Sequence, residues 1–232
     1  MIEVNGLSGL YIVVDGIVGC GKSEQIKQLK EHLGLDFSER DFLFTYEPGG
    51  NPEADVLRQK VKFEKMSPVE EAKTFAESRA ITIPQVVVPF LAREGVVVSD
   101  RSFTTSLAYQ AFGRGLGINK VWEANEKAVG KIFPDVLVYM NVGLEASLKR
   151  SSGENPDKFD KEARGFWHKV VPGYAKMICF LKEISPNTKV IQIDDPKGEM
   201  NIEVMRLAIK SELYPIIREH LHEGRISRDR QV

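Results

Sequence analysis

The chain has 232 residues, of which 28% are charged, and its net charge is −1 at pH 7. A general nucleic-acid binder is usually more basic, and a membrane span needs about 20 consecutive apolar residues, so we expect neither a nucleic acid nor a membrane as a partner. The length suits one α/β domain over residues 1–232. The two cysteines, Cys20 and Cys179, have no metal-ligand spacing, so we expect no disulfide and a cytoplasmic location.

Five short apolar runs predict β-strands, and helical patterns separate them. The runs are Leu10–Asp15, Phe42–Thr45, Val96–Ser99, Val136–Met140 and Val190–Ile193. The helical patterns cover roughly Glu24–Leu33, Glu53–Phe63, Pro68–Arg93, Thr105–Phe112 with Lys120–Ile132, Leu144–Ser151, Lys161–Ile184 and Glu199–His222. Strands that alternate with helices predict a five-stranded parallel sheet with helices on both faces, which is a three-layer α/β fold.

The first strand continues into a glycine-rich loop, Gly16–Ser23, which fits the pattern G-x-x-x-x-G-K-[ST]. Its glycines let backbone N–H groups point inward at a helix N-terminus, which makes an anion site, where Lys22 would reach the β/γ-phosphates and Ser23 would hold Mg²⁺. A tight glycine turn with a surface lysine is the alternative. Strand, loop and helix together indicate a P-loop NTPase fold. The predicted nucleotide-binding residues are Gly16, Gly19, Cys20, Gly21, Lys22 and Ser23.

Ligands in parallel sheets bind at the carboxyl ends of the strands, and the residues there carry suitable chemistry. After the second strand, Glu47–Pro52 has two prolines and two glycines, which suit a loop close to a ligand or a plain turn. After the third strand come Asp100 and Arg101. A carboxylate at this position acts on Mg²⁺, and an arginine makes a bidentate contact with a phosphoryl group. A surface ion pair is the alternative.

Two further features suit a nucleotide enzyme without requiring one. Phe75 and Arg79 lie one helical turn apart, where the ring can stack on a base and the guanidinium can donate to its carbonyl edge. On the pair alone, a core phenylalanine beside an exposed arginine is the preferred explanation. The charged stretch 157–164 predicts a short mobile lid over about 151–165, or else a solvated loop. Residues 224–232 are expected to form a frayed tail.

Together these motifs resemble the thymidylate kinases, nucleoside monophosphate kinases that phosphorylate dTMP. The likeness runs from Leu10 to about His220. The matching segments are Gly16–Ser23, Glu47–Gly50, Asp100-Arg101, Ser106–Gln110, Gly113–Leu116, Phe133–Asp135 and the lid region from Asp157 to Tyr174.

The resemblance implies ATP and Mg²⁺ as cofactors, dTMP as the acceptor and a homodimer. It gives catalytic roles to Lys22, Asp100, Arg101 and Lys158, with Arg150 as a helper of Lys158, and places Ser23 and Asp100 at the metal. Arg58 and Arg101 would grip the acceptor phosphate, Phe75 would stack on the base, Arg79, Ser106 and Gln110 would contact the pyrimidine edge, and Tyr109 would crowd the 2′ position. The implied acceptor-binding residues are Glu47, Pro48, Arg58, Phe75, Arg79, Arg101, Ser106, Tyr109 and Gln110.

Some members of the family carry an arginine in the phosphate loop, and others have a glycine there and take the positive charge from the lid; Gly19 resembles the second kind. Four positions depart from the family pattern. Lys158 replaces the lid arginine. Val18 stands where the family has an acid, Tyr46 where it has an arginine, and Asn51 where threonine is common. Two alternatives therefore stay open: a kinase for another or modified deoxypyrimidine monophosphate, and a nucleotide-binding module without catalysis. A GTP-driven switch is disfavoured because no N-K-x-D stretch is present.

Overall fold

The computed structural model describes residues 7–38, 41–151 and 157–229. In these residues five parallel strands form one sheet in the order β2-β3-β1-β4-β5. Each predicted strand is confirmed, with its ends shifted by at most two residues. The strands are β1 (Leu10–Gly16), β2 (Phe42–Tyr46), β3 (Val96–Asp100), β4 (Val136–Val142) and β5 (Lys189–Asp195).

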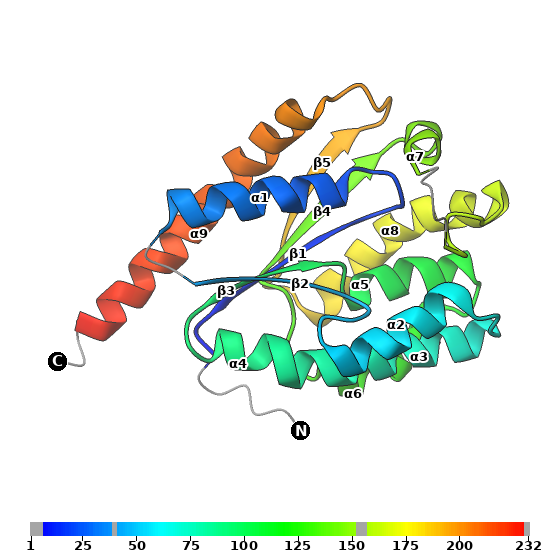
Figure 1. Cartoon of the computed structure of the whole chain (residues 1–232), viewed down its shortest axis with the longest axis horizontal. Helices are drawn as coiled ribbons and strands as arrows, with labels where there is room; N and C mark the ends of the chain where they lie inside the picture. Colours follow the sequence, from blue (N-terminus) through cyan, green and yellow to red (C-terminus); the bar gives the residue numbers. More distant parts are fainter. Residues whose placement is uncertain (1–6, 39–40, 152–156, 230–232) are drawn as a thin grey trace.

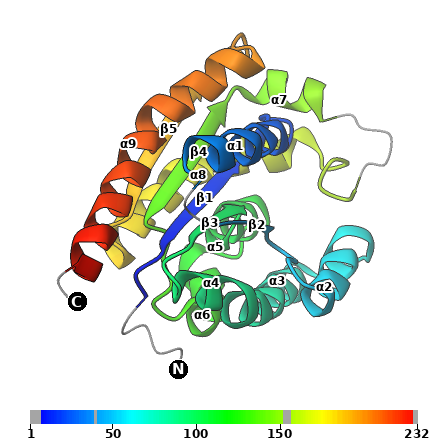
Figure 2. The ribbon, with the colours of Figure 1, turned by 60° about the vertical axis from the view of Figure 1, so that its left-hand side comes forward.

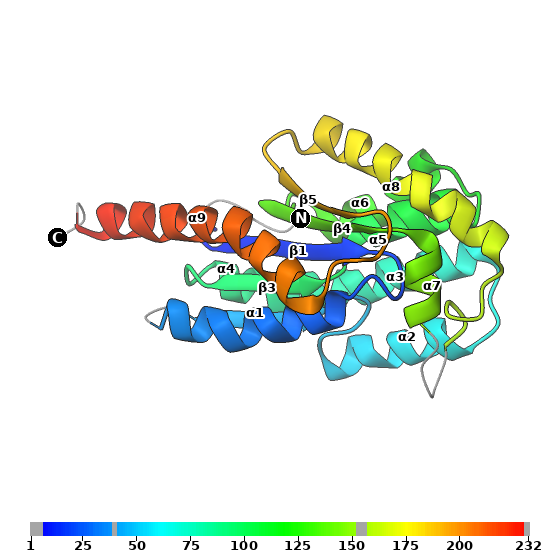
Figure 3. The ribbon, with the colours of Figure 1, turned by 90° about the horizontal axis from the view of Figure 1, so that it is seen from above.

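Helices cover both faces of the sheet, as the predicted three-layer arrangement requires. Figure 1 shows α1 (Lys22–Asp36) beside α9 (Ile202–Asp229), and Figure 3 shows α1 and α8 (Arg164–Ile184) on opposite faces. Because it is covered on both faces, all seven residues of the central strand β1 are buried. Figure 2 shows a group of helices on the side away from α1 and α9, formed by α2 (Pro52–Phe63), α3 (Pro68–Thr82), α4 (Val88–Leu91) and α6 (Ile118–Val129).

The helix predicted over Pro68–Arg93 is divided in the structure. After α3 the chain forms a π-helical turn, η1 (Ile83–Val87), and then the short α4. Pro84 lies inside the turn and has no N–H to donate to the carbonyl four residues earlier, which favours a wider turn. The helix predicted from Thr105 likewise becomes α5 (Phe103–Ser106) followed by η2 (Leu107–Gly113), another π-helical turn.

Side chains that cap helices fix two of the helix starts near the carboxyl edge of the sheet. Asn51 accepts a hydrogen bond from the backbone N–H of Ala54 at 2.8 Å and begins α2. Asparagine and threonine both cap helices. Asn51 can therefore cap α2 as the threonine common at this position in the family would. Ser67 and Glu70 form a capping box at the start of α3.

The chain ends in the long helix α9. It continues to Asp229, into the segment expected to be a frayed tail, and residues 230–232 lie outside the described residues. Most of the turn expected to begin the lid, residues 152–156, also lies outside them. None of the helices in the described ranges is both long and apolar enough to cross a membrane.

Candidate active site

The glycine-rich loop is folded around its own lysine. The Nζ atom of Lys22 donates to the carbonyl oxygens of Gly16 and Ile17, at 3.0 and 2.8 Å, and the side chain is 6% exposed. Gly19 and Gly21 have φ angles of 68° and 95°, in the left-handed region that favours glycine. The loop is therefore already curled, with a cation at its centre, before any anion binds.

The structure explains why position 19 of the loop is glycine. A Cβ atom built on Gly19 would lie 1.9 Å from the carbonyl oxygen of Ser147, in the short helix α7 (Leu144–Arg150). Because the backbone fixes the position of a Cβ atom and the oxygen that it would meet is also backbone, a side-chain rotation cannot relieve the contact. In this conformation the loop has no room for the arginine that other members of the resembled family carry here.

Asp15, which the sequence analysis passed over, is the buried carboxylate that anchors the loop. It is 0% exposed and accepts hydrogen bonds at 2.6–2.8 Å from the Gly16 N–H and from the hydroxyls of Thr104, Thr105 and Tyr174. Burial raises the pKa of Tyr174, so its hydroxyl stays a donor. A carboxylate in an otherwise apolar strand, directly before the glycine-rich loop, is the sequence feature that could have identified it.

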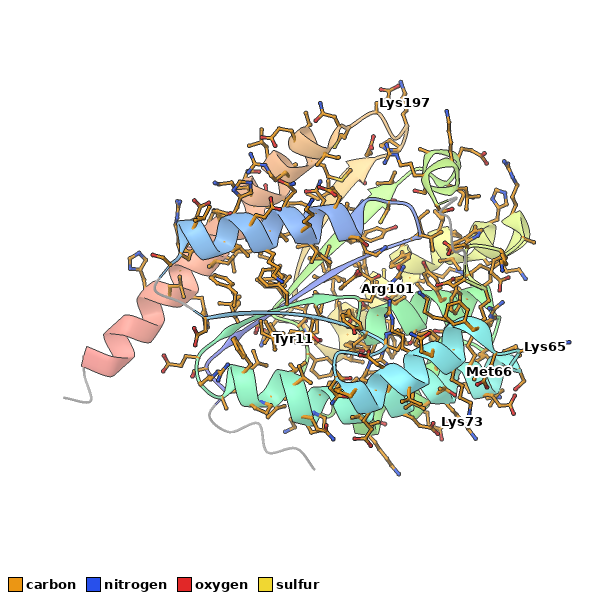
Figure 4. All side chains as sticks on the ribbon, in the orientation of Figure 1. Tyr11, Lys65, Met66, Lys73, Arg101 and Lys197 are labelled. Atoms are coloured by element: carbon orange, nitrogen blue, oxygen red, sulfur yellow. The ribbon has the colours of Figure 1, made fainter. Side chains whose placement is uncertain are left out.

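Arg101 directly follows β3 and lies near the middle of the view in Figure 4, whereas Lys65 and Lys73 lie toward its edge. Its backbone has a φ of 72°, an uncommon value for a residue with a side chain, and its N–H donates to the Val14 carbonyl at 2.9 Å. This strained backbone directs the guanidinium toward the loop, where it lies 3.3 Å from the Gly16 carbonyl oxygen and 3.8 Å from Asp15.

Asp100 and Ser23 fit the requirements of a magnesium ion. Both line the cavity above the loop, and Oδ1 of Asp100 is buried with no hydrogen-bond partner in the described residues. Mg²⁺ commonly takes only one or two protein ligands and completes its shell with water and substrate phosphates. The described residues contain no cluster of three or more histidine, cysteine or acidic side chains that could hold a metal alone, which agrees with such a shared site.

Two cavities meet at this edge of the sheet. The loop cavity has a volume of about 770 Å³, and its lining includes Val18–Gln25, Asp100, Arg150, Met200–Ile202 and Met205. The aromatic cavity has about 90 Å³ and is lined by Glu47, Pro48, Val61, Lys62, Phe75, Thr105, Tyr109, Gln110 and Phe159. The residues that line both cavities are Val18, Arg58, Arg101 and Asp157.

The junction between the cavities carries two cations. Arg58 is held by the Pro48 carbonyl at 2.8 Å, and its guanidinium lies 4.7 Å from the centre of the Tyr46 ring. Arg101 lies 5.2 Å from the centre of the Tyr109 ring. Val18 brings no charge, and the carboxylate of the junction comes from Asp157 of the lid. Guanidinium groups bind phosphoryl groups well. Two of them at the junction therefore suit a phosphoryl group that lies between a ligand in one cavity and a ligand in the other.

The aromatic cavity has polar atoms that lack partners. Oε1 of Glu47, the hydroxyl of Tyr109 and Oε1 of Gln110 are all buried without a hydrogen-bond partner in the part of the chain that the structure describes. Such atoms are uncommon in folded proteins because each one costs about 1–3 kcal/mol. A polar ligand in this cavity would satisfy all three atoms.

Four of the predicted site residues do not line either cavity. Gly16 begins the loop and lies beneath it, accepting from Lys22. Arg79 is 2% exposed and donates to Oε2 of Glu47 at 2.6 Å and to Asn125. Burial raises the pKa of Glu47, and the charge of Arg79 opposes this shift. The remaining two are Ser106, which is buried at the end of α5, and Lys158.

The lid segment after residue 156 is attached to α3 and η2 rather than to the loop. Nζ of Lys158 lies 2.8 Å from Oε2 of Glu71, and Arg114 bridges Glu71 and Glu162 at 3.0 and 2.5 Å. Phe159, which no sequence pattern singled out, packs against the rings of Phe75 and Tyr109, with centroids 6.1 and 5.9 Å away. The lid therefore closes the aromatic cavity with a hydrophobic side chain.

The remaining predicted residues are brought together. Gly19, Cys20, Gly21, Lys22, Ser23 and Asp100 line the loop cavity, while Glu47, Pro48, Phe75, Tyr109 and Gln110 line the aromatic cavity. Arg58 and Arg101 join the two cavities. An anion-binding loop, a second cavity and cations at the junction define a phosphoryl-transfer enzyme of the P-loop kinase class.

Comparison with known proteins defines the family. The sequence model of thymidylate kinase matches residues 14–201. The thymidylate kinase of Mycoplasmopsis pulmonis is 36% identical over 171 residues, covering 71% of this chain and 73% of that protein. That of Trichormus variabilis is 30% identical over 224 residues, covering 93% and 100%. The chain belongs to the thymidylate kinase family, so the resemblance found in the motifs is confirmed.

A solved structure agrees with the predicted fold class. The crystal structure of the thymidylate kinase from Ehrlichia chaffeensis superposes with a TM-score of 0.69 and covers 89% of this chain and 98% of that one. At 21% sequence identity this similarity concerns the fold. The five-stranded parallel sheet flanked by helices is therefore confirmed.

Proposed function

We propose that this chain transfers the γ-phosphoryl group of ATP to the 5′-phosphate of dTMP, giving dTDP and ADP. The observation that carries the proposal is the meeting of the two cavities at Arg58 and Arg101. The loop cavity, at about 770 Å³, has the volume of a nucleotide site and holds the phosphate loop. The donor nucleotide binds there, and the acceptor binds in the aromatic cavity.

The chemistry needs no covalent intermediate and no strong general base. A phosphate oxygen of the acceptor is already a nucleophile, so positioning and charge neutralisation carry the reaction. Lys22 binds the donor phosphates, while Arg101 and Arg58 hold the acceptor phosphate in line. Ser23 and Asp100 would hold Mg²⁺, whose chemistry when bound is to neutralise the donor phosphates.

In this proposal the acceptor base stacks on Phe75 and is bordered by Tyr109 and Gln110. The aromatic cavity, at about 90 Å³, is smaller than the roughly 300–1,000 Å³ of ligand clefts, so Phe159 must shift when the acceptor enters. Roles for Arg79, Ser106 and Lys158 stay predictions. The side chains of Arg79 and Lys158 would have to leave the contacts that they make now with Glu47 and Glu71, and Ser106 is buried without lining either cavity.

An acceptor panel tests the proposed function. The purified full-length chain is given ATP and Mg²⁺ with dTMP, dUMP, dCMP, a 5-modified dUMP or thymidine, and ADP formation is followed. We expect the highest kcat/KM for dTMP and no transfer to thymidine, which lacks the phosphate that Arg58 and Arg101 bind. A clear preference for the modified nucleotide would favour the alternative suggested by Val18 at the junction. Tight ATP binding without transfer to any acceptor would instead identify a non-catalytic module.

Tyr46 compensates in part for the arginine that it replaces. Its ring supports the Arg58 guanidinium, and its hydroxyl donates to Asp55, with oxygen distances of 2.9 and 3.0 Å. Because a half-exposed cation–π contact contributes about 0.5–1 kcal/mol, Tyr46→Leu is expected to raise the KM for dTMP about 2- to 5-fold. Tyr46→Phe keeps the ring and should change KM less.

Steady-state kinetics of both variants check this prediction, with Phe63→Leu as a matched control. Phe63, the last residue of α2, is an aromatic residue that is 63% exposed and does not line either cavity. The assigned contact is wrong if Tyr46→Leu and Phe63→Leu both keep the KM of the unmodified chain.

The homodimer and the cytoplasmic location stay predictions from the sequence and the family. We include the homodimer in the proposal because it follows from the family resemblance, and analytical ultracentrifugation of the purified chain at micromolar concentration would test it.

A further inference from the structure

Gln110 lines the aromatic cavity from the π-helical turn η2 and is 1% exposed. One end of its side-chain amide is engaged, since Nε2 donates to Oε1 of Glu71 at 2.9 Å. The other end, Oε1, is buried without a hydrogen-bond partner in the described residues. The amide therefore has one satisfied donor end and one unsatisfied acceptor end.

The direction of this amide follows from the chemistry of Glu71. An ionised carboxylate only accepts hydrogen bonds, so it must face the NH₂ end of an amide and cannot face its oxygen. Glu71 is 2% exposed and is bonded by Arg114, with Nε and Nη2 both at 3.0 Å, and by Lys158 at 2.8 Å. Burial raises the pKa of Glu71, but the hydrogen bonds from Arg114 and Lys158 outweigh it and keep the pKa below its usual value.

We propose that Glu71 is a positioning residue for acceptor specificity: by fixing Nε2 of Gln110, it presents Oε1 to the acceptor base and so selects pyrimidines that carry an N3–H. This inference rests on the proposed function, in which the aromatic cavity binds the acceptor. Thymine and uracil carry a proton on N3 and can satisfy the buried oxygen. Cytosine has an unprotonated N3, which would leave two acceptors facing each other.

Glu71 lies outside the cavity, so it acts through Gln110 and not on the substrate. Arg114 and Lys158 bring positive charge to the same carboxylate, and Arg114 also pairs with Glu162 of the lid. In the described part of the chain, the buried carboxylate of Glu71 thus contacts both Gln110 and Lys158 of the lid.

Glu71→Gln tests the inference, because a neutral amide can donate as well as accept and lets Gln110 turn over. The measured quantity is the ratio of kcat/KM for dTMP to that for dCMP, and we expect it to fall about 10- to 100-fold. The ratio of dTMP to dUMP should not change, since both bases carry N3–H. A purely structural role would lower all three values by the same factor, and that result would overturn the inference.

Glu162→Gln is the matched control. It removes the other carboxylate bonded to Arg114 and leaves the Glu71–Gln110 pair in place, so the dTMP to dCMP ratio should stay that of the unmodified chain. If Glu71→Gln does not fold by circular dichroism, Glu71→Asp keeps the charge but shortens the side chain, and a smaller fall of the ratio in the same direction is expected. An unchanged ratio in a folded variant at position 71 overturns the inference.

The unmodified chain separates failure of the inference from failure of the proposed function. Transfer to dTMP by the unmodified chain supports the function whatever the variants do. A dTMP analogue methylated at N3 gives a further test on the unmodified chain, because the methyl group removes the proton that Oε1 needs. We expect it to bind at least 10-fold more weakly than dTMP, and equal binding would contradict the orientation of Gln110.

Discussion

Replacement of Lys22 by methionine is expected to lower kcat for dTMP phosphorylation by about 10³-fold, because the charge at the centre of the phosphate loop is lost where the transition state needs it. Methionine keeps most of the aliphatic stem in a side chain that is 6% exposed. The variant also loses the hydrogen bonds to the carbonyls of Gly16 and Ile17, which should lower the free energy of unfolding by about 1–3 kcal/mol.

ADP formation with dTMP and the thermal midpoint of unfolding together check this prediction. Lys27→Met, an exposed lysine of the same helix, is the control and should keep both values. Undiminished turnover by a folded Lys22→Met variant would show that the loop does not hold the donor phosphates.

Replacement of Asp15 by alanine is expected to have the largest effect on stability. Its carboxylate, which is 0% exposed, accepts from four donors within 2.8 Å and lies 3.8 Å from Arg101. Removal leaves the hydroxyls of Thr104, Thr105 and Tyr174 and the Arg101 charge without their partner. Loss of one member of such a buried network costs about 3–5 kcal/mol of unfolding free energy.

Urea unfolding of the purified chain measures this cost. Asp41→Ala removes an exposed aspartate just before β2 and should change the free energy of unfolding by less than about 0.5 kcal/mol. Asp15→Asn keeps one acceptor oxygen and should be less destabilised than Asp15→Ala. Equal stability of the unmodified chain and Asp15→Ala would mean that the network does not anchor the loop.

The sequence alone determined the fold class and the glycine-rich loop that lines part of the loop cavity. Apolar runs such as Leu10–Asp15 can only be buried in a sheet covered on both faces. The pattern Gly16–Ser23 predicts the shape of the loop locally, because its glycines permit the curled backbone and its lysine lies at the centre of the curl. Asp100 and Arg101 were predicted as site residues in the same way, since the end of a parallel strand is the ligand edge. Each of these predictions uses residues adjacent in the sequence, or the single rule that ligands bind at the carboxyl ends of parallel strands.

Only the tertiary structure decided how residues distant in the sequence pair. The family resemblance implies that Arg79 contacts the pyrimidine edge, which stays a prediction; the structure pairs Arg79 with Glu47, 32 positions away. Lys158 was expected over the transferred phosphoryl group and pairs instead with Glu71. A buried charged side chain needs a partner of opposite charge. Because that partner comes from a distant segment of the chain, the spacing of residues along one helix cannot identify it.

The same limit applies to the residues that sequence analysis missed. Phe159 lies in the lid, where the sequence has no periodicity. Glu70 and Glu71 are adjacent acids on α3, and only the structure shows that Glu71 is the buried one. Gly19 was read as a family variant, whereas the structure shows a backbone contact with α7 that excludes any side chain. Sequence thus predicted which groups bind phosphate, because that geometry is built within one loop. Tertiary packing decided which groups line the aromatic cavity, because that cavity is assembled from six separate segments of the chain.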